Sequence, residues 1–167
     1  MNLIKYLVIF FIFSLISFNI SIAKSTETDE ELKAKKMNNC IELYLQDKYD
    51  EGIKSIDKFE GDKSIKSDPI AMGFLTDLRG SILIAMGKYN DGMDCFDKVL
   101  EMKKTDEAHE VLRLVTAQLK VNALYGNGQK DEANKYYNEM KKSYSGLEWK
   151  INGDLKAIWS EILTPAP

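Results

Sequence analysis

Gly87-Lys-Tyr-Asn-Asp-Gly-Met-Asp-Cys-Phe-Asp-Lys-Val99 has a related stretch on each side, at nearly equal distances along the chain. These stretches are Asp47-Lys-Tyr-Asp-Glu-Gly-Ile-Lys-Ser-Ile-Asp-Lys-Phe59 and Gly128-Gln-Lys-Asp-Glu-Ala-Asn-Lys-Tyr-Tyr-Asn-Glu-Met140. Their equivalent small residues Gly52, Gly92 and Ala133 lie 40 and 41 positions apart. A period of this length is typical of repeat proteins, in which each unit stacks on its neighbours to bury an apolar face. The sequence therefore predicts three stacked units.

The apolar residues of these units follow a helical period. Leu75, Leu78 and Ile82 recur at steps of three and four, which is typical of a helix with one buried stripe. Asp68 before Pro69 marks a helix start, because a capping carboxylate and a proline at the first helical position are both favourable there. We therefore predict an all-α fold with helices at 29–45, 50–60, 69–86, 90–103, 106–125, 131–144 and 147–163.

The predicted helices pair into units of about 29–60, 69–103 and 106–144, within one domain of residues 24–163 and before a tail of 164–167. We expect Asp50, Asn90 and Asp131 to begin the second helix of each unit, where an acid or amide suits the positive end. The helix at 147–163 is expected to cap the open end of the third unit, which a stack needs for solubility. Its apolar residues are Leu147, Leu155, Ile158, Trp159 and Ile162. The Asn152-Gly153 pair leaves open a turn followed by a shorter helix.

The N-terminus has the pattern of a secretory signal peptide. A positive charge at Lys5 precedes an apolar run from Tyr6 to Ile22, and Ser21-Ile22-Ala23 offers the small-x-small pattern of a cleavage site. We predict a signal peptide at 1–23, cleavage after Ala23 and a periplasmic or secreted protein. The alternative is a retained membrane anchor, since the run approaches the length of a spanning helix.

The charge balance of the chain argues against two classes of partner. The chain has 23 Lys and Arg against 26 Asp and Glu, so it lacks the basic field that nucleic acid or anionic lipid would require. Neither nucleic acid nor a membrane is expected as a partner, unless the N-terminal segment is kept as an anchor.

Cys40 and Cys95 would enter an oxidising compartment, where two cysteines permit a disulfide. They fall on helices that are not neighbours in the repeat, so we expect two buried thiols instead.

The repeated stretch resembles the second half of a tetratricopeptide repeat, in which a Gly-x-Tyr turn leads into Ala-x-x-x-Phe. The matching positions are Gly87, Tyr89, Gly92 and Phe96 in unit two, Tyr49, Gly52 and Ile56 in unit one, and Gly128, Ala133 and Tyr137 in unit three. The small residue of the first helix corresponds to Gly80, with Cys40 and Val121 elsewhere. The family's first-helix tryptophan and closing proline are missing, and the period exceeds the family's 34 residues. The resemblance covers about residues 30–144 and implies a short right-handed α-solenoid.

Proteins of that family generally bind an extended peptide or a partner helix along the concave face of their first helices. The resemblance places ten residues on this face: Met37, Asn38, Ile41, Tyr44, Asp77, Ser81, Ile84, Gln118, Asn122 and Tyr125. Gln118 and Asn122 suit hydrogen bonds to a peptide backbone, whereas the apolar members equally suit packing between helices. Asp77 would repel a C-terminal carboxylate, so a ligand with basic residues is the more compatible one.

No catalytic constellation is visible, and we expect neither enzymatic activity, nor a cofactor, nor a metal. His109, the only histidine, lies among Asp106, Glu107 and Glu110, where a solvated or ion-paired side chain is expected. No phosphate loop, nucleophile elbow or zinc pattern occurs. We therefore predict a scaffold for protein–protein interaction of a bacterial, periplasmic type. Two alternatives stay open: a structural subunit that docks or self-associates through its terminal helices, and an accessory or inhibitor of an envelope enzyme.

Overall fold

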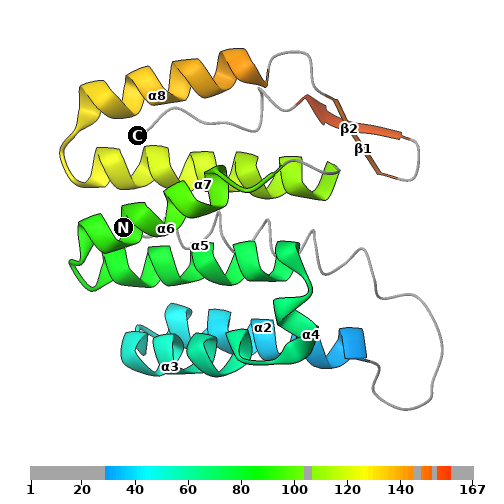
Figure 1. Cartoon of the computed structure of the whole chain (residues 1–167). Helices are drawn as coiled ribbons and strands as arrows, with labels where there is room; N and C mark the ends of the chain where they lie inside the picture. Colours follow the sequence, from blue (N-terminus) through cyan, green and yellow to red (C-terminus); the bar gives the residue numbers. More distant parts are fainter. Residues whose placement is uncertain (1–28, 104–106, 145–147, 152–153, 159–167) are drawn as a thin grey trace. The chain divides into compact units, whose positions relative to one another are not determined.

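The computed structural model describes residues 29–103, 107–144, 148–151 and 154–158 (Figure 1). The helices of this part are α2 (Asp29–Leu45), α3 (Tyr49–Glu60), α4 (Lys63–Lys66), α5 (Pro69–Ala85), α6 (Tyr89–Leu100), α7 (Glu107–Gly126) and α8 (Lys130–Ser143). Two strands follow, β1 (Glu148–Ile151) and β2 (Asp154–Ile158). The predicted helical fold is confirmed up to α8, and the ends of six helices lie within three residues of the expected ones. The predicted cleavage site after Ala23 lies outside the described residues.

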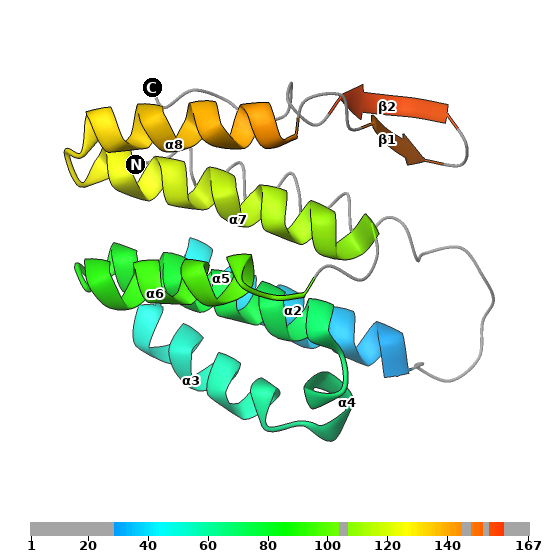
Figure 2. The ribbon, with the colours of Figure 1, turned by 45° about the horizontal axis from the view of Figure 1, so that its top comes forward.

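The chain divides into two compact units, residues 1–95 and 96–167, and the division falls within α6. In the first unit, the α2–α3 hairpin packs on α5, and α4 lies between α3 and α5 (Figure 2). Its interior is apolar, with Cys40, Ile56, Phe59, Ile65, Leu75, Leu78 and Ile82 all buried. These residues come from four helices, so burial of apolar side chains between helices is the main favourable term in this unit.

Two glycines let second helices approach first helices closely in the first unit. A Cβ atom at Gly92 would lie 2.5 Å from Cγ1 of Ile84 and 2.7 Å from the carbonyl oxygen of Gly80. A Cβ atom at Gly52 would lie 3.0 Å from Cδ1 of Ile82. The small residue therefore recurs because a larger one would clash with the facing helix. The contact is closest where α6 crosses α5.

The turns within the three repeats share one backbone conformation. Asp47, Gly87 and Gly128 hold equivalent places, and each has a positive φ, of 59°, 79° and 83°. This left-handed conformation is easiest for glycine and is tolerated by aspartate. Helix α3 begins one residue before Asp50, and α8 one residue before Asp131, so these acids lie in the first helical turn, where they still suit the helix dipole.

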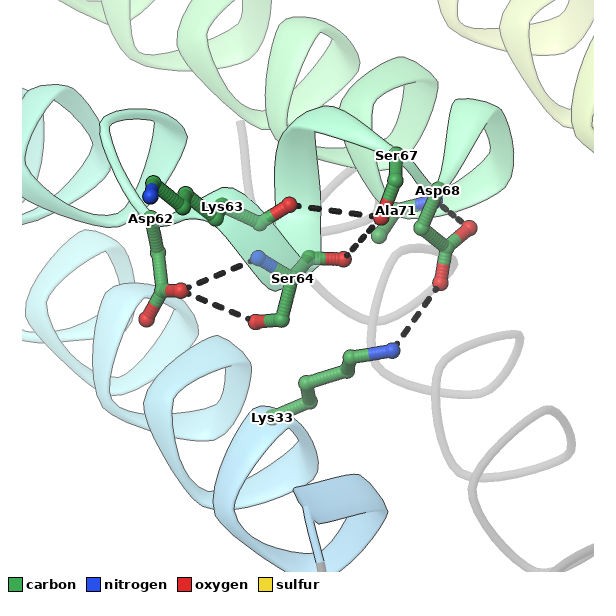
Figure 3. A network of polar contacts seen from close by, with 7 residues as sticks. All are labelled: Lys33, Asp62, Lys63, Ser64, Ser67, Asp68 and Ala71. Carbon is green, nitrogen blue, oxygen red and sulfur yellow. Dashed lines mark hydrogen bonds and ion pairs between the residues drawn. The ribbon is translucent and has the colours of Figure 1, made fainter.

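The helix α4 lies between the predicted helices at 50–60 and 69–86, where no helix was predicted. Asp62 caps it, because its Oδ1 accepts hydrogen bonds from the backbone N–H of Ser64 at 3.1 Å and from the Ser64 hydroxyl at 3.0 Å (Figure 3). Asp68 caps the following helix α5 by accepting from the N–H of Ala71 at 3.0 Å, as Asp68-Pro69 predicted. Ile65 of α4 is buried.

Two lysines of α2 hold the α4 connection in place. Nζ of Lys33 lies 3.6 Å from Oδ2 of Asp68 (Figure 3), and Nζ of Lys36 lies 2.7 Å from Oδ2 of Asp62. Lys36 also lies over the ring of Phe59, 5.4 Å from its centroid. The hydrogen bond from Lys36 is the main cause that lowers the pKa of Asp62 to about 2. Opposite charges therefore join the first helix of repeat one to the segment that leads into repeat two.

In the second unit, α7 and α8 form an antiparallel hairpin, which lies side by side in both views (Figures 1 and 2). Helix α7 is buried on several sides, through Val111, Leu112, Leu114, Thr116, Ala117, Leu119, Val121, Ala123 and Leu124. In α8 only Ala133 and Tyr137 are buried, which is the pattern of a helix with one apolar stripe. No described helix combines the length and the hydropathy that crossing a membrane requires.

The prediction of a capping helix at 147–163 is wrong. Strands β1 and β2 pair antiparallel there, with Glu148 opposite Ile158 and Ile151 opposite Asp154, and the register shifts between Trp149 and Lys150. The sequence explains the strands, because polar and apolar residues largely alternate in steps of two on both sides of Asn152-Gly153. That pair is the strongest short-range signal for a hairpin. Residues 159–163 of the expected helix lie outside the described part.

Helix α8 has a polar exposed side. Its exposed residues are polar: Lys130, Asp131, Glu132, Asn134, Lys135, Asn138, Glu139, Lys141, Lys142 and Ser143. A terminal helix with a polar outer face closes the end of a repeat array.

Candidate functional site

The ten predicted binding residues lie on α2, α5 and α7, and we call them the first-helix face; all except Asn38 occupy equivalent positions. If Cys40, Gly80 and Val121 are aligned, three further positions align: Met37 with Asp77 and Gln118, Ile41 with Ser81 and Asn122, and Tyr44 with Ile84 and Tyr125. Helices α2 and α5 lie in the first unit and α7 in the second, and each part is described within its own unit. The face changes from apolar in repeat one to largely polar in repeats two and three.

On α2, the face is an apolar strip. Ile41 and Tyr44 are buried, and Met37 and Asn38 are half-buried. The ring of Tyr44 packs against that of Tyr49, with 6.2 Å between centroids. Burial raises the pKa of Tyr44 to about 12, so its phenol stays neutral at physiological pH. Ile41 and Tyr44 therefore serve packing in this structure, as the alternative interpretation of the apolar members expected.

On α5, the face carries a buried carboxylate. Asp77 is 4% exposed and Ser81 is 6% exposed, and the Ser81 hydroxyl donates to the carbonyl oxygen of Asp77 at 3.0 Å. Ile84 is half-buried, and its side chain packs on Gly92 of α6. Ile84 is therefore a packing residue, whereas Asp77 remains the chemically distinctive group of this helix, since aspartate is rarely buried.

On α7, the face carries two joined amides. Nε2 of Gln118 donates to Oδ1 of Asn122 at 3.1 Å, and both residues are 8% exposed. Tyr125 is half-buried, and Nζ of Lys130 lies 5.0 Å from the centroid of its ring. The amides, four residues apart, lie on one side of the helix as neighbours.

The residues predicted to pack the repeats are buried, with two exceptions. Cys40, Gly52, Gly80, Gly92, Phe96, Ala133 and Tyr137 are buried, and the turn tyrosines Tyr49 and Tyr89 are half-buried. The hydroxyl of Tyr49 donates to Oδ1 of Asp47 at 2.6 Å, and this bond raises the pKa of Tyr49. Tyr49 thereby holds the side chain of Asp47, the turn residue with a positive φ.

Both cysteines are buried, and neither takes part in a disulfide. The thiol of Cys40 lies 3.3 Å from the hydroxyl of Ser55, and burial raises the pKa of this thiol. Cys95 is likewise covered by its surroundings. The structure thus has two buried thiols rather than a disulfide, in agreement with the positions of the cysteines in the repeat.

His109 is 7% exposed, so of its two expected states, solvated or ion-paired, the solvated one is wrong. The cause is its place on α7, next to the buried residues Val111 and Leu112, in a helix that is covered on several sides. Within the described ranges, no three His, Cys, Asp or Glu side chains come together in a way that could hold a metal ion.

Arg79 and Lys120 each form ion pairs with the second helix of the preceding repeat, and these contacts were missed from the sequence. Nη2 of Arg79 donates to Oδ1 of Asp57 and to Oε2 of Glu60, both at 2.7 Å, so α5 is joined to α3. Lys120 of α7 pairs with Asp97 of α6 in the same way. Asp57 and Asp97 lie 40 positions apart, and Arg79 and Lys120 lie 41 positions apart. An acidic and a basic residue thus recur at almost the same spacing, and this recurrence was the signal in the sequence that could have predicted the ion pairs.

The comparisons with known proteins add no relative: no family model, no curated protein and no solved structure matches the chain.

Proposed function

We propose that this chain is an exported, non-enzymatic interaction module that binds a peptide or a partner helix on its first-helix face. The right-handed solenoid and the relationship to tetratricopeptide repeats belong to this proposal. So does the export of the chain, since residues 1–23 have the pattern of a signal peptide.

One observation carries the proposal: polar side chains are buried at the same two positions of α5 and α7. Asp77 and Gln118 hold one position, and Ser81 and Asn122 hold the other. A polar group in a helix interface costs stability unless it is hydrogen-bonded, and an apolar residue of similar size would pack as well. Repeat one has such apolar residues there, namely Met37 and Ile41. The polar residues of the other two repeats are therefore best explained by recognition.

The charge on this face favours a basic ligand. Asp77 is an acid, and Ser81, Gln118 and Asn122 are neutral, so the ten residues together carry a negative charge. A lysine or arginine of a ligand would gain from meeting the buried carboxylate, whereas a C-terminal carboxylate would be repelled. The proposed partner is therefore a protein segment that carries a basic residue.

The outer helices give less support to the alternative of a structural subunit. Leu32 of α2, at 39% exposure, is the exposed large apolar side chain of the described residues, and the exposed side of α8 is polar. Surfaces for permanent docking are usually enriched in apolar residues at their centre. The terminal helix that this alternative required is also absent from residues 148–158. An envelope enzyme remains one possible class of partner for the proposed face.

The test compares two double variants of the full chain with a C-terminal affinity tag. Asp77→Asn/Asn122→Leu removes the charge and the amide from the face. Asp94→Asn/Asn127→Ala removes the same two groups from exposed positions and serves as the matched control. Partners captured from an envelope fraction are quantified by mass spectrometry, and helicity is followed by circular dichroism.

We expect the face variant to lose at least one partner that the wild type and the control both retain. Equal partner lists for all three proteins, with equal helicity, would contradict the proposed face. The N-terminal sequence of the exported protein checks the location, since cleavage after Ala23 predicts a chain that begins at Lys24.

A further inference from the structure

The β1–β2 hairpin forms a sheet of two strands, each with one outer edge. Within the part of the chain that the structure describes, β1 and β2 pair only with each other (Figure 2). No described helix packs closely along either strand. A hairpin of two strands is marginally stable in water, and an outer edge presents a row of backbone N–H and C=O groups to which a further strand can bind. An added strand would therefore stabilise the hairpin.

The two outer edges are not equivalent. Between Trp149 and Lys150 the register shifts, and the residue of β2 that is skipped is Lys156. Such a bulge bends and twists its strand and disrupts regular pairing, and natural sheets use bulges to protect an edge. The extra residue lies on β2, so the outer edge of β1 is the better one for a further strand.

The charges of β1 face apolar residues across the hairpin. Ile158 lies opposite Glu148, and Leu155 lies opposite Lys150. Along β1 itself, an acid and a base flank Trp149. An antiparallel copy of this strand, centred on Trp149, would place each Glu148 opposite a Lys150 and the two tryptophans opposite each other. Opposite charges and aromatic pairs directly across two strands are both stabilising.

Other arrangements of two β1 strands are less favourable. A parallel pair in register would place Glu148 opposite Glu148 and Lys150 opposite Lys150, and like charges directly opposite are destabilising. An antiparallel pair shifted by one residue would place Trp149 opposite Lys150, and Glu148 opposite Ile151. Both charges would then lack a counter-charge. The order of residues in β1 therefore favours a second copy of the same strand, in one register.

We propose that two copies of this chain associate through β1, which pairs antiparallel with itself around Trp149 and so forms a four-stranded sheet across a two-fold axis. Such a contact uses the same surface on both copies and closes after two. The bulge at Lys156 disfavours the addition of further strands at the outer edges of this sheet. The inference goes beyond the proposed function and does not depend on the first-helix face.

The test reverses the charges of β1 in the full chain as it is purified after export. A dimer of Lys150→Glu would place acids opposite acids, and a dimer of Glu148→Lys would place bases opposite bases. An equimolar mixture of the two variants would restore opposite charges at both pairs. Lys142→Glu makes the same change at an exposed position of α8 and is the matched control. Sedimentation velocity over a range of concentrations gives the dimer fraction, and circular dichroism verifies that each variant folds.

We expect the wild type and Lys142→Glu to dimerise with the same dissociation constant. Each reversal alone should raise this constant roughly tenfold, because two attractive pairs become repulsive, and the mixture should return it close to the wild-type value. Asp77→Asn/Asn122→Leu should dimerise like the wild type, so the failure of the proposed face can be distinguished from the failure of this contact. The β1 contact is overturned by a wild type that stays monomeric at every concentration, by equal dimerisation of all variants, or by a mixture as weak as its components.

Discussion

Replacing Gly92 by alanine tests the steric reason for the repeat. The added Cβ atom would lie 2.5 Å from Cγ1 of Ile84 and 2.7 Å from the carbonyl oxygen of Gly80. Ile84 can change its rotamer, but the carbonyl oxygen belongs to the backbone of α5. Helices α5 and α6 must therefore move apart to admit the methyl group.

The expected change in the free energy of unfolding follows from two opposing contributions. Overpacking of a tight contact costs about 1–3 kcal/mol, and a clash with backbone lies at the upper end. Alanine in place of a mid-helix glycine recovers about 1 kcal/mol. The net loss for Gly92→Ala is thus about 2 kcal/mol. At Gly52 the nearest atom is Cδ1 of Ile82 at 3.0 Å, the end of a flexible side chain, so the two terms nearly cancel there.

The assay is urea unfolding followed by circular dichroism, with Gly52→Ala as the matched control. We expect Gly92→Ala to unfold at lower urea and to lose about 4–8 °C in Tm, and Gly52→Ala to stay close to the wild type. If Gly92→Ala is as stable as the wild type, α5 and α6 do not approach as closely as described, and the steric argument fails.

Three further predictions concern other parts of the chain. Gly87→Ala should lose about 1–2 kcal/mol of stability in urea unfolding, because φ is 79° at this turn and alanine is strained there; an unchanged midpoint would contradict the turn conformation. Asp62→Asn should remove part of the acid sensitivity of unfolding. The folded pKa of Asp62 is about 2 and its ordinary value is 3.8, so its contribution is present at neutral pH and is lost as the pH falls from 3.8 towards 2; identical acid profiles would refute this. Cys40 and Cys95 should react with Ellman's reagent only after denaturation, since both thiols are buried, and fast reaction of the native protein would show that one is accessible.

Much of the fold could be predicted because helix signals are local. The steps of three and four in apolar residues and the Asp68-Pro69 start located six helices to within three residues. Local signals also explain the error at residues 148–158. There, Leu155 and Ile158 were fitted to a helical period, although Asn152-Gly153 between alternating residues favours a hairpin. The error came from weighing a capping role above the chemistry of the turn.

The candidate binding residues were predicted from their equivalent places in the repeats, and their surroundings in the fold were not predicted. Repeat equivalence placed Asp77 with Gln118 and Ser81 with Asn122, and all four are buried polar residues. That Ile84 packs on Gly92 follows from the closeness of two helix axes, which no single segment records. The same holds for His109, whose burial depends on what covers α7 from several sides.

The amino-acid sequence determined the helical period, the turn positions and the spacing of small residues, because these depend on neighbours within one or two helical turns. Distances between helices were set by three-dimensional packing. The Arg79 bridge to Asp57 and Glu60, the ties of Lys33 and Lys36 to the α4 connection and the joined amides of Gln118 and Asn122 each need side chains to be brought to within hydrogen-bonding or ion-pair reach. Such contacts depend on rotamers and on the approach of whole helices, and these are properties of the folded chain that a linear pattern does not contain.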